Sequence, residues 1–472
     1  METLFVLLIV ALCAFVLIKK IFKQVKGGKC DCGCGCDNNC GSCSKSDTCM
    51  TQLMRKSKNK NSWQKINKKG EQKKMKKVVV AAFLAAVVTL GTSGAYAADA
   101  ENLLEGLSIN GGITLILQSL QKSNVAQATE IGYETPTVGS YSVDLEIEKK
   151  FDDNNTAFLH LETGTGDANS RFTAFSGINR DADDSGNQVS VTEAWFEHKF
   201  TDSFGMTFGV IDPTSSLDDN AYANDETSQF LGDIFRNAPV ISFGDNAIGI
   251  KAVYETDFID VAAQYLNVEN TIEIGPDEEI NNDDITRHGF VSAQVNFKPG
   301  FIEDMEGNYR IYAWGLLDGG TKWEDDEQTT DYGFGVSIDQ QISDIFGVFA
   351  RYSWKRDDAY SSTIGTFDGD FASPCNQTWS IGAQAKINAL GEEDIVGLAF
   401  GQMMISDKAK DSYGYDFKAE DHLEVYYSWN ISDYLAVTPS IQYVNNVCGG
   451  AAEDMGADNS AFVGSIRMQI SF

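Results

Sequence analysis

The sequence has little histidine, little proline and no familiar catalytic motif. Its 472 residues include four His and seven Pro. It has no G-x-S-x-G turn, no P-loop and no H-E-x-x-H pair, so no nucleophile or metal-bound water has its usual neighbours. These absences predict that the chain is not an enzyme, and we expect no cofactor in its large C-terminal part.

Long apolar runs are scarce as well. Apolar residues make up 43% of the chain, which excludes a protein built mainly of membrane-spanning helices. Glycine is abundant by contrast, with 43 residues. Much glycine with little proline is typical of many strands joined by glycine-containing turns.

Acidic residues are concentrated after residue 97. Residues 1–97 hold 17 Lys and Arg against five Asp and Glu, whereas the rest holds 20 basic and 63 acidic residues. The excess of acidic residues after residue 97 predicts that this part of the chain does not bind nucleic acid. A pore through it would favour cations or neutral solutes over anions.

The N-terminal segment, residues 1–50, predicts a membrane helix followed by a cysteine-rich stretch. Leu4 to Ile18 is almost wholly apolar and is followed by five lysines, which places the lysines in the cytoplasm and the helix in the inner membrane. Glycine-spaced thiols can bind a soft metal ion or an iron–sulfur cluster. The candidate ligands are Cys30, Cys32, Cys34, Cys36, Cys40 and Cys43. This order of helix, basic collar and cysteine cluster resembles FeoB-associated cysteine-rich membrane proteins, which implies a ferrous-iron transporter as its partner.

After residue 50 the sequence again resembles the beginning of a chain. Residues 51–74 are a polar, lysine-rich linker, and residues 75–97 have the basic, apolar and small-residue regions of a signal peptide. Ala95, Tyr96 and Ala97 form an A-x-A cleavage site, so we expect residues 98–472 to be exported. A true fusion and a start codon assigned too far upstream both account for residues 1–74, and the sequence leaves the two open.

Residues 98–472 predict an all-β fold. The last eleven residues alternate between an apolar face that ends in Phe472 and a largely polar face that contains Arg467 and Gln469. Alternation between two solvents is typical of outer-membrane strands. About sixteen such segments occur, and a 16-stranded antiparallel transmembrane β-barrel is favoured over a soluble β-sandwich. They begin near Leu107, Ser140, Thr156, Val189, Gly205, Ile248, Ile259, Gly289, Gly307, Asp331, Phe346, Thr378, Asp394, His422, Leu435 and Ala461.

The connections and the strand parity locate a candidate pore. Short turns alternate with long loops, and the longest, Pro213–Ala247, is expected to fold inward and narrow the lumen. Acidic, guanidinium and aromatic side chains suit sugar hydroxyls and C–H faces, although a generic polar lumen would show the same parity. The predicted pore-lining or substrate-binding residues are Glu146, Glu148, Glu162, Glu193, Trp195, Arg310, Tyr312, Trp314 and Arg351. Cys375 and Cys448 fall in outward loops, where a disulfide and two thiols are both open.

Four segments carry a family resemblance: Asp218–Phe230, Glu393–Gly401, Val437–Tyr443 and Ile466–Phe472. Through them residues 98–472 resemble the carbohydrate-selective porins of Gram-negative outer membranes (the OprB type). The resemblance implies a sixteen-stranded porin that passes sugars or similar small solutes down their gradient. Its expected partners are sugars or cations, outer-membrane lipid, the barrel-assembly machinery and further copies of the chain. The acidic lumen and the iron-associated leader keep an iron- or siderophore-related uptake channel as the alternative.

Overall fold

The computed structural model describes residues 104–121, 137–166, 174–179, 188–244, 246–268, 289–325, 327–361, 374–391, 393–451 and 458–472. The predicted membrane helix, cysteine cluster, linker and signal peptide of residues 1–97 lie outside this part of the chain. Within it, no helix is long and apolar enough to cross a membrane.

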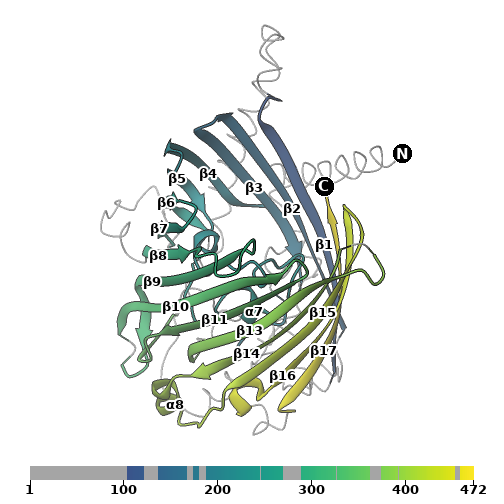
Figure 1. Cartoon of the computed structure of the whole chain (residues 1–472). Coiled ribbons are helices and arrows are strands. Elements are labelled where there is room, and N and C mark those ends of the chain that lie inside the picture. The colour runs from purple at the N-terminus through teal and green to yellow at the C-terminus, as the bar shows by residue number, and fades with distance from the viewer. Residues whose placement is uncertain are drawn as a thin grey trace, which may run out of the picture.

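The described strands form one closed antiparallel barrel (Figure 1). Sixteen strands pair in chain order, and the first pairs with the last from Gly112↔Ser471 to Gln121↔Phe462. These strands are β1 Leu107–Gln121, β2 Thr137–Asp152, β3 Asn155–Thr165, β4 Ser190–Thr201, β5 Phe204–Ile211, β6 Ala247–Glu255, β7 Ile259–Asn267, β8 Gly289–Phe297, β9 Gly307–Lys322, β10 Gln328–Ser343, β11 Phe346–Lys355, β13 Cys375–Ile387, β14 Asp394–Ile405, β15 Glu420–Ser432, β16 Leu435–Asn445 and β17 Ser460–Ser471. The predicted sixteen-stranded barrel is confirmed, and every strand begins within three residues of its predicted start.

The sequence did not predict the short elements between the strands. β12, Ala359–Ser361, pairs with the far end of β9 and extends the sheet on the long-loop side. The helix α8, Asp407–Tyr413, lies in the β14–β15 connection, where Ser406 caps its first turn and Gly414 ends it with a positive φ of 62°. The helix α8 is at the end of the barrel opposite the short turns (Figure 1).

The two faces of the wall differ as the alternation predicts. On β1, Leu115 and Leu117 are exposed on the outer face, while Thr114 and Gln118 are buried on the inner face. The register carries this parity around the barrel, because Thr114 is opposite Ser142 on β2 and Gln469 on β17. Lipid therefore meets apolar side chains, and the interior is polar.

Phe472 closes the seam between the first and last strands. Its N–H donates to the carbonyl of Gly111 at 3.0 Å, and its carbonyl accepts from the N–H of Gly111 at 2.9 Å. A side chain at Gly111 would meet the Phe472 ring at 2.9 Å. The terminal residue thus leaves no unpaired edge beside β1.

Candidate functional site in the barrel lumen

The connection between β5 and β6, residues 212–246, folds into the barrel, as predicted; we call it the lumen loop. It contains the short helices η1, Pro213–Ser216, and α7, Asp233–Arg236. Near its start, Gln264 of β7 donates to the carbonyl of Pro213 at 2.7 Å, and Gln294 of β8 accepts from the N–H of Asp218 at 2.9 Å. The side-chain amides of the inner face therefore serve as hydrogen-bond partners for the loop backbone, in place of a neighbouring strand.

A buried arginine fixes the middle of the lumen loop. Arg351 of β11 donates to the carbonyls of Phe235 and Asp218 at 2.8 and 3.0 Å, and its Nε lies 3.3 Å from the Asp218 carboxylate. The two side chains are 1% and 0% exposed. Burial raises the pKa of Asp218, while the guanidinium of Arg351 and the N–H of Ala238 act in the opposite direction. The guanidinium of Arg351 thus connects Asp218 and Phe235, which lie at the two ends of the middle section of the lumen loop.

A second arginine anchors the adjoining turn. Arg310 of β9 is paired with Asp339 of β10 and lies 3.0 Å from Asp219 of the loop. Asp339 also accepts from the N–H of Ala221 at 3.2 Å, and Asn220 donates to Ser337 at 3.1 Å. These groups form one charge-assisted network between the wall and the loop.

The far end of the lumen loop reaches the closing strands. Arg467 of β17 donates to the carbonyls of Glu226 and Gln229 at 2.7 and 2.8 Å. Glu424 of β15 accepts from the N–H groups of Leu231 and Gly232 at 3.0 and 2.9 Å. The loop therefore spans from β7 to β17 and covers the inner face of that half of the wall.

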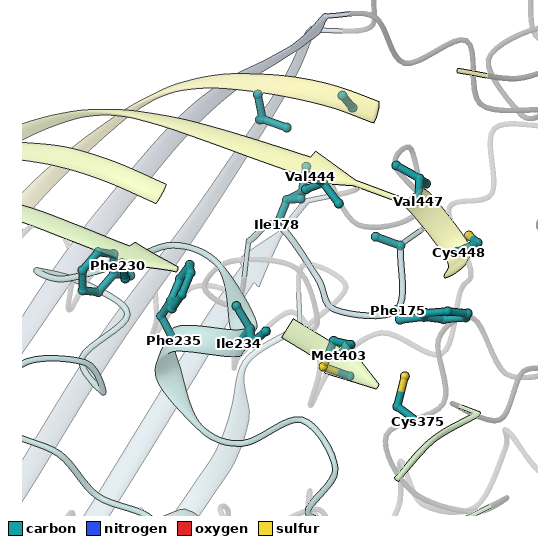
Figure 2. Packing of buried hydrophobic residues seen from close by; sticks show 14 of the residues in the cluster. Phe175, Ile178, Phe230, Ile234, Phe235, Cys375, Met403, Val444, Val447 and Cys448 are labelled. Carbon is teal, nitrogen blue, oxygen red and sulfur yellow. The ribbon is translucent and has the colours of Figure 1, made fainter. Parts of the chain in front are cut away.

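The underside of the lumen loop is apolar. Towards β5–β9, Leu217, Ala238 and Ile241 pack with Phe290, Tyr312 and Trp314 in what we call the base cluster. Towards β11–β17, Phe230, Ile234 and Phe235 pack with Met403, as Figure 2 shows, in what we call the tip cluster. Burial of this apolar area holds the loop against the wall, in addition to its hydrogen bonds.

A second inward segment, residues 174–179 of the β3–β4 connection, joins the tip cluster through Phe175 and Ile178 (Figure 2). The carbonyl of Ile178 accepts from Gln442 at 2.8 Å, and Glu420 accepts from the N–H of Phe175 at 2.8 Å. The N–H of Asp233 donates to the carbonyl of Gly177 at 3.0 Å. The two inward segments are thus connected.

Four of the predicted solute-binding residues face inward but are covered. Arg310, Tyr312, Trp314 and Arg351 are only 2–5% exposed. Tyr312 and Trp314 belong to the base cluster, and both arginines hold the lumen loop. Parity predicted their inward direction, but the loop occupies the space in front of them, so these positions do not favour direct contact with a solute.

The other predicted residues lie on the opposite, less covered wall. Glu146, Glu148, Glu162, Glu193 and Trp195 are half-buried on β2, β3 and β4. Trp195 stacks on Phe158 with ring centroids 4.9 Å apart, and its indole N–H donates to Glu193 at 3.0 Å. This wall also contacts the lumen loop. Lys251 donates to Ser215 at 3.2 Å, Glu193 accepts from the N–H of Asp212 at 3.5 Å, and Trp195 packs against the edge of the base cluster. The wall combines carboxylates with an aromatic pair.

The comparisons agree with this geometry. A family described as "Carbohydrate-selective porin, OprB family" matches residues 140–472. The chain belongs to this family. It is an outer-membrane porin of the Gram-negative type, a channel that allows carbohydrates or similar small solutes to diffuse passively.

One solved structure resembles this porin in fold, and two others match it with lower TM-scores. The high-pH structure of Pseudomonas putida OprB is 14% identical with a TM-score of 0.63, covering 80% of this chain and 97% of that chain. The low-pH structure of the same protein is 13% identical with a TM-score of 0.48, covering 81% and 98%. A triple mutant of the Rhodopseudomonas blastica porin is 12% identical with a TM-score of 0.43, covering 78% and 100%. No curated protein matches the chain.

The family match leaves the iron-related alternative without support. In the described part of the porin, no group of three or more His, Cys, Asp and Glu side chains could hold a metal ion. The candidate cysteine ligands of residues 30–43 lie outside that part, so their metal stays a prediction.

Cys375 and Cys448 both lie in the tip cluster and are each 1% exposed. They contribute to the apolar packing around Phe175 (Figure 2). Their oxidation state was left open by the sequence, and a disulfide between them stays a prediction.

Besides Arg310 and Arg351, other residues that hold the two inward segments were not among the predicted site residues. Asp218, Glu420, Glu424 and Arg467 are among the most buried polar residues of the porin. The available signal was parity, because Glu424 and Arg467 both fall on the polar face of their strands. That signal does not distinguish a residue that contacts solute from one that binds a folded-in loop.

Proposed function

We propose that sugars cross along the wall of β2–β6, beside the start of the lumen loop, and bind transiently beside Phe158 and Trp195. The observation that carries this proposal is the stacked pair, half-buried on an inner face that also presents Glu193 and His160. Aromatic rings contact the C–H faces of a pyranose, and carboxylates accept from its hydroxyls. The covered half of the lumen offers neither group to a passing solute.

Replacing Trp195 by alanine should weaken the block of ion current by a sugar about three- to tenfold, because a well-placed ring contributes about 0.5–1.5 kcal/mol beyond its buried area. Current through porin purified from cells that express the full chain is measured in planar bilayers while glucose or a maltodextrin is titrated. The conductance without sugar should change little.

The matched control is Trp354→Ala. Trp354 faces outward on β11 and packs against Phe334, which is 51% exposed. This control should keep the wild-type sugar block. Equal block in Trp195→Ala and the wild type would show that sugars bind elsewhere in the lumen.

The same wall should give a modest preference for cations. Glu146, Glu148, Glu162 and Glu193 face the lumen on neighbouring strands. The reversal potential in a salt gradient should indicate selectivity for K⁺, and it should shrink as salt rises from about 0.1 M to about 1 M, where the Debye length falls from about 10 Å to about 3 Å. A preference for anions would contradict the assignment of this wall to the pore.

The N-terminal region has a separate proposed role. Cleavage after Ala97 would release the porin, while residues 1–50 would stay in the inner membrane, bind a soft metal through their cysteines and contact a ferrous-iron transporter. The support is the sequence pattern of residues 1–97. Protein purified from outer membranes should begin at Ala98 in N-terminal sequencing. Outer-membrane porin that retains Cys30–Cys49 would contradict this proposal.

Assembly of the porin from further copies of the chain is also a proposal. Further copies of the chain would bury part of the outer apolar face, which includes exposed Leu115, Leu117 and Ile466 near the seam. Mass measurement in detergent decides between a single barrel and an oligomer.

A further inference from the structure

The inner face of the barrel distributes its charges unequally. The three arginines of the described strands, Arg310, Arg351 and Arg467, are 0–5% exposed, and all three hold the lumen loop. Lys355 of β11 is 5% exposed and pairs with the buried carboxylate of Asp331. These cationic donors are therefore committed to the protein itself, and a solute in the passage does not reach them.

The wall of β2–β4 presents carboxylates instead. Of the basic groups on this wall, His160 lies 3.3 Å from Asp144, and Lys150, which is 65% exposed, lies 3.4 Å from Glu148. Asp144 is also directly opposite Glu162, and like charges in such pairs are destabilising. A carboxylate only accepts hydrogen bonds, so this wall favours solutes that bring donors and positive charge. Its inner-face carboxylates are all half-buried: Asp144, Glu146, Glu148, Glu162, Glu193 and Glu197.

Three of these carboxylates surround the stacked pair of Phe158 and Trp195. Glu148 of β2 is directly opposite Phe158. Glu193 precedes Trp195 by two residues and Glu197 follows it by two, so both lie on its face of β4. Opposite side chains have Cβ atoms about 4.5–5.5 Å apart, and successive side chains on one face of a strand are about 7 Å apart. A hexose on the ring pair would have a carboxylate within reach on either side.

We propose that this site selects amino sugars, which are hexoses with a protonated amine, over neutral and acidic sugars; the inference rests on the proposed sugar path beside Phe158 and Trp195. The C–H face of the hexose lies on the rings, and its ammonium group donates to Glu148, Glu193 or Glu197. An ammonium offers three donors and a charge where a hydroxyl offers one donor. A uronic acid brings a further negative charge to the same wall and is repelled.

Block of the ion current tests this selection on porin purified from cells that express the full chain. At about pH 6 amines are protonated, and at about 0.1 M salt charges are only partly screened. Glucosamine should block about three- to tenfold more tightly than glucose, whereas N-acetylglucosamine should match glucose and glucuronate should block more weakly.

The failure of this inference is distinguishable from the failure of the sugar path. Equal block by glucosamine and glucose, both weakened in Trp195→Ala, would overturn the selection of amino sugars and leave the path in place. Block by both sugars that Trp195→Ala does not change would contradict the path, and the selection would fall with it.

A small cation separates a sugar site from general attraction of cations. Ethanolammonium carries the same charge as glucosamine but has no ring to lie on Phe158 and Trp195. It should block at least about threefold more weakly than glucosamine, because the ring contact is missing. If ethanolammonium blocked as tightly as glucosamine, the lumen would attract any cation, and selection of amino sugars would be refuted.

Paired substitutions locate the selection. Glu148→Gln combined with Glu193→Gln removes two charges beside the rings and keeps an acceptor for the indole N–H of Trp195. The preference for glucosamine over glucose should fall to about onefold to twofold. The matched control is Glu303→Gln combined with Glu306→Gln, on the exposed turn between β8 and β9, and it should keep the wild-type preference.

A wild-type preference in the Glu148 and Glu193 double variant would show that these carboxylates do not select the sugar. If that variant does not assemble, the comparison of glucosamine, glucose and ethanolammonium in the wild-type porin decides by itself.

Discussion

Replacing Arg351 by alanine should loosen the lumen loop by about 3–5 kcal/mol, because the truncation leaves the Asp218 carboxylate buried without its cationic partner. It also removes the donors to the carbonyls of Phe235 and Asp218. Hydrogen exchange in residues 212–244 should accelerate by about a hundredfold or more. In bilayers, the open-channel current should become noisy, while the barrel strands stay protected.

Arg236→Ala is the matched control for this prediction. Its guanidinium lies 2.6 Å from Glu226, but the two side chains are 20% and 29% exposed, so the loss should be about 0–1 kcal/mol. Joint replacement of Asp218 by Asn and Arg351 by Met should recover part of the protection, since no buried charge is then unpaired. Wild-type exchange in Arg351→Ala would mean that apolar packing alone holds the loop.

Deleting Phe472 should prevent most of the chain from assembling in the outer membrane. The deletion removes both backbone hydrogen bonds to Gly111 and the last apolar side chain of the seam. A barrel that closes poorly leaves N–H and C=O groups of β1 facing lipid, where each unsatisfied group costs several kcal/mol. The yield of folded, heat-modifiable porin in outer membranes measures the effect.

Phe472→Tyr is the control, because it keeps an aromatic end and both backbone hydrogen bonds. It should assemble close to the wild-type level. If the deletion gave as much folded porin as Phe472→Tyr, the terminal residue would have no part in closure or in recognition by the assembly machinery.

The barrel itself was predictable from the sequence for a physical reason. Lipid outside and water inside impose a period of two on every strand, as β1 and β17 show, and a change of one residue in register would reverse the two faces. The inward course of the lumen loop was also predicted, from its length and from its resemblance to the porin family. Short elements such as β12 were not, because three residues carry no periodic signal.

The candidate site was predicted only in part. Parity assigned Trp195 and Trp314 alike to the inner face, yet Trp195 is half-buried at the edge of the base cluster, whereas Trp314 is buried within it. What covers an inner face depends on contacts between distant segments, such as Arg467 with Glu226, which are 241 residues apart. No local pattern records such a pair, so the role of the residues that hold the loop emerged only from the three-dimensional arrangement.

Liposome swelling with sugars of increasing size tests the central claim most directly, which is that the lumen loop makes this barrel a passive, size-limited sugar channel. Liposomes that contain the purified porin should swell rapidly in monosaccharides and progressively more slowly in longer oligosaccharides, without any energy source. Replacing residues 219–237 by a short glycine-serine linker should speed the entry of the longer sugars most. No swelling in any sugar, or equal rates for all sizes in the wild type, would contradict the account.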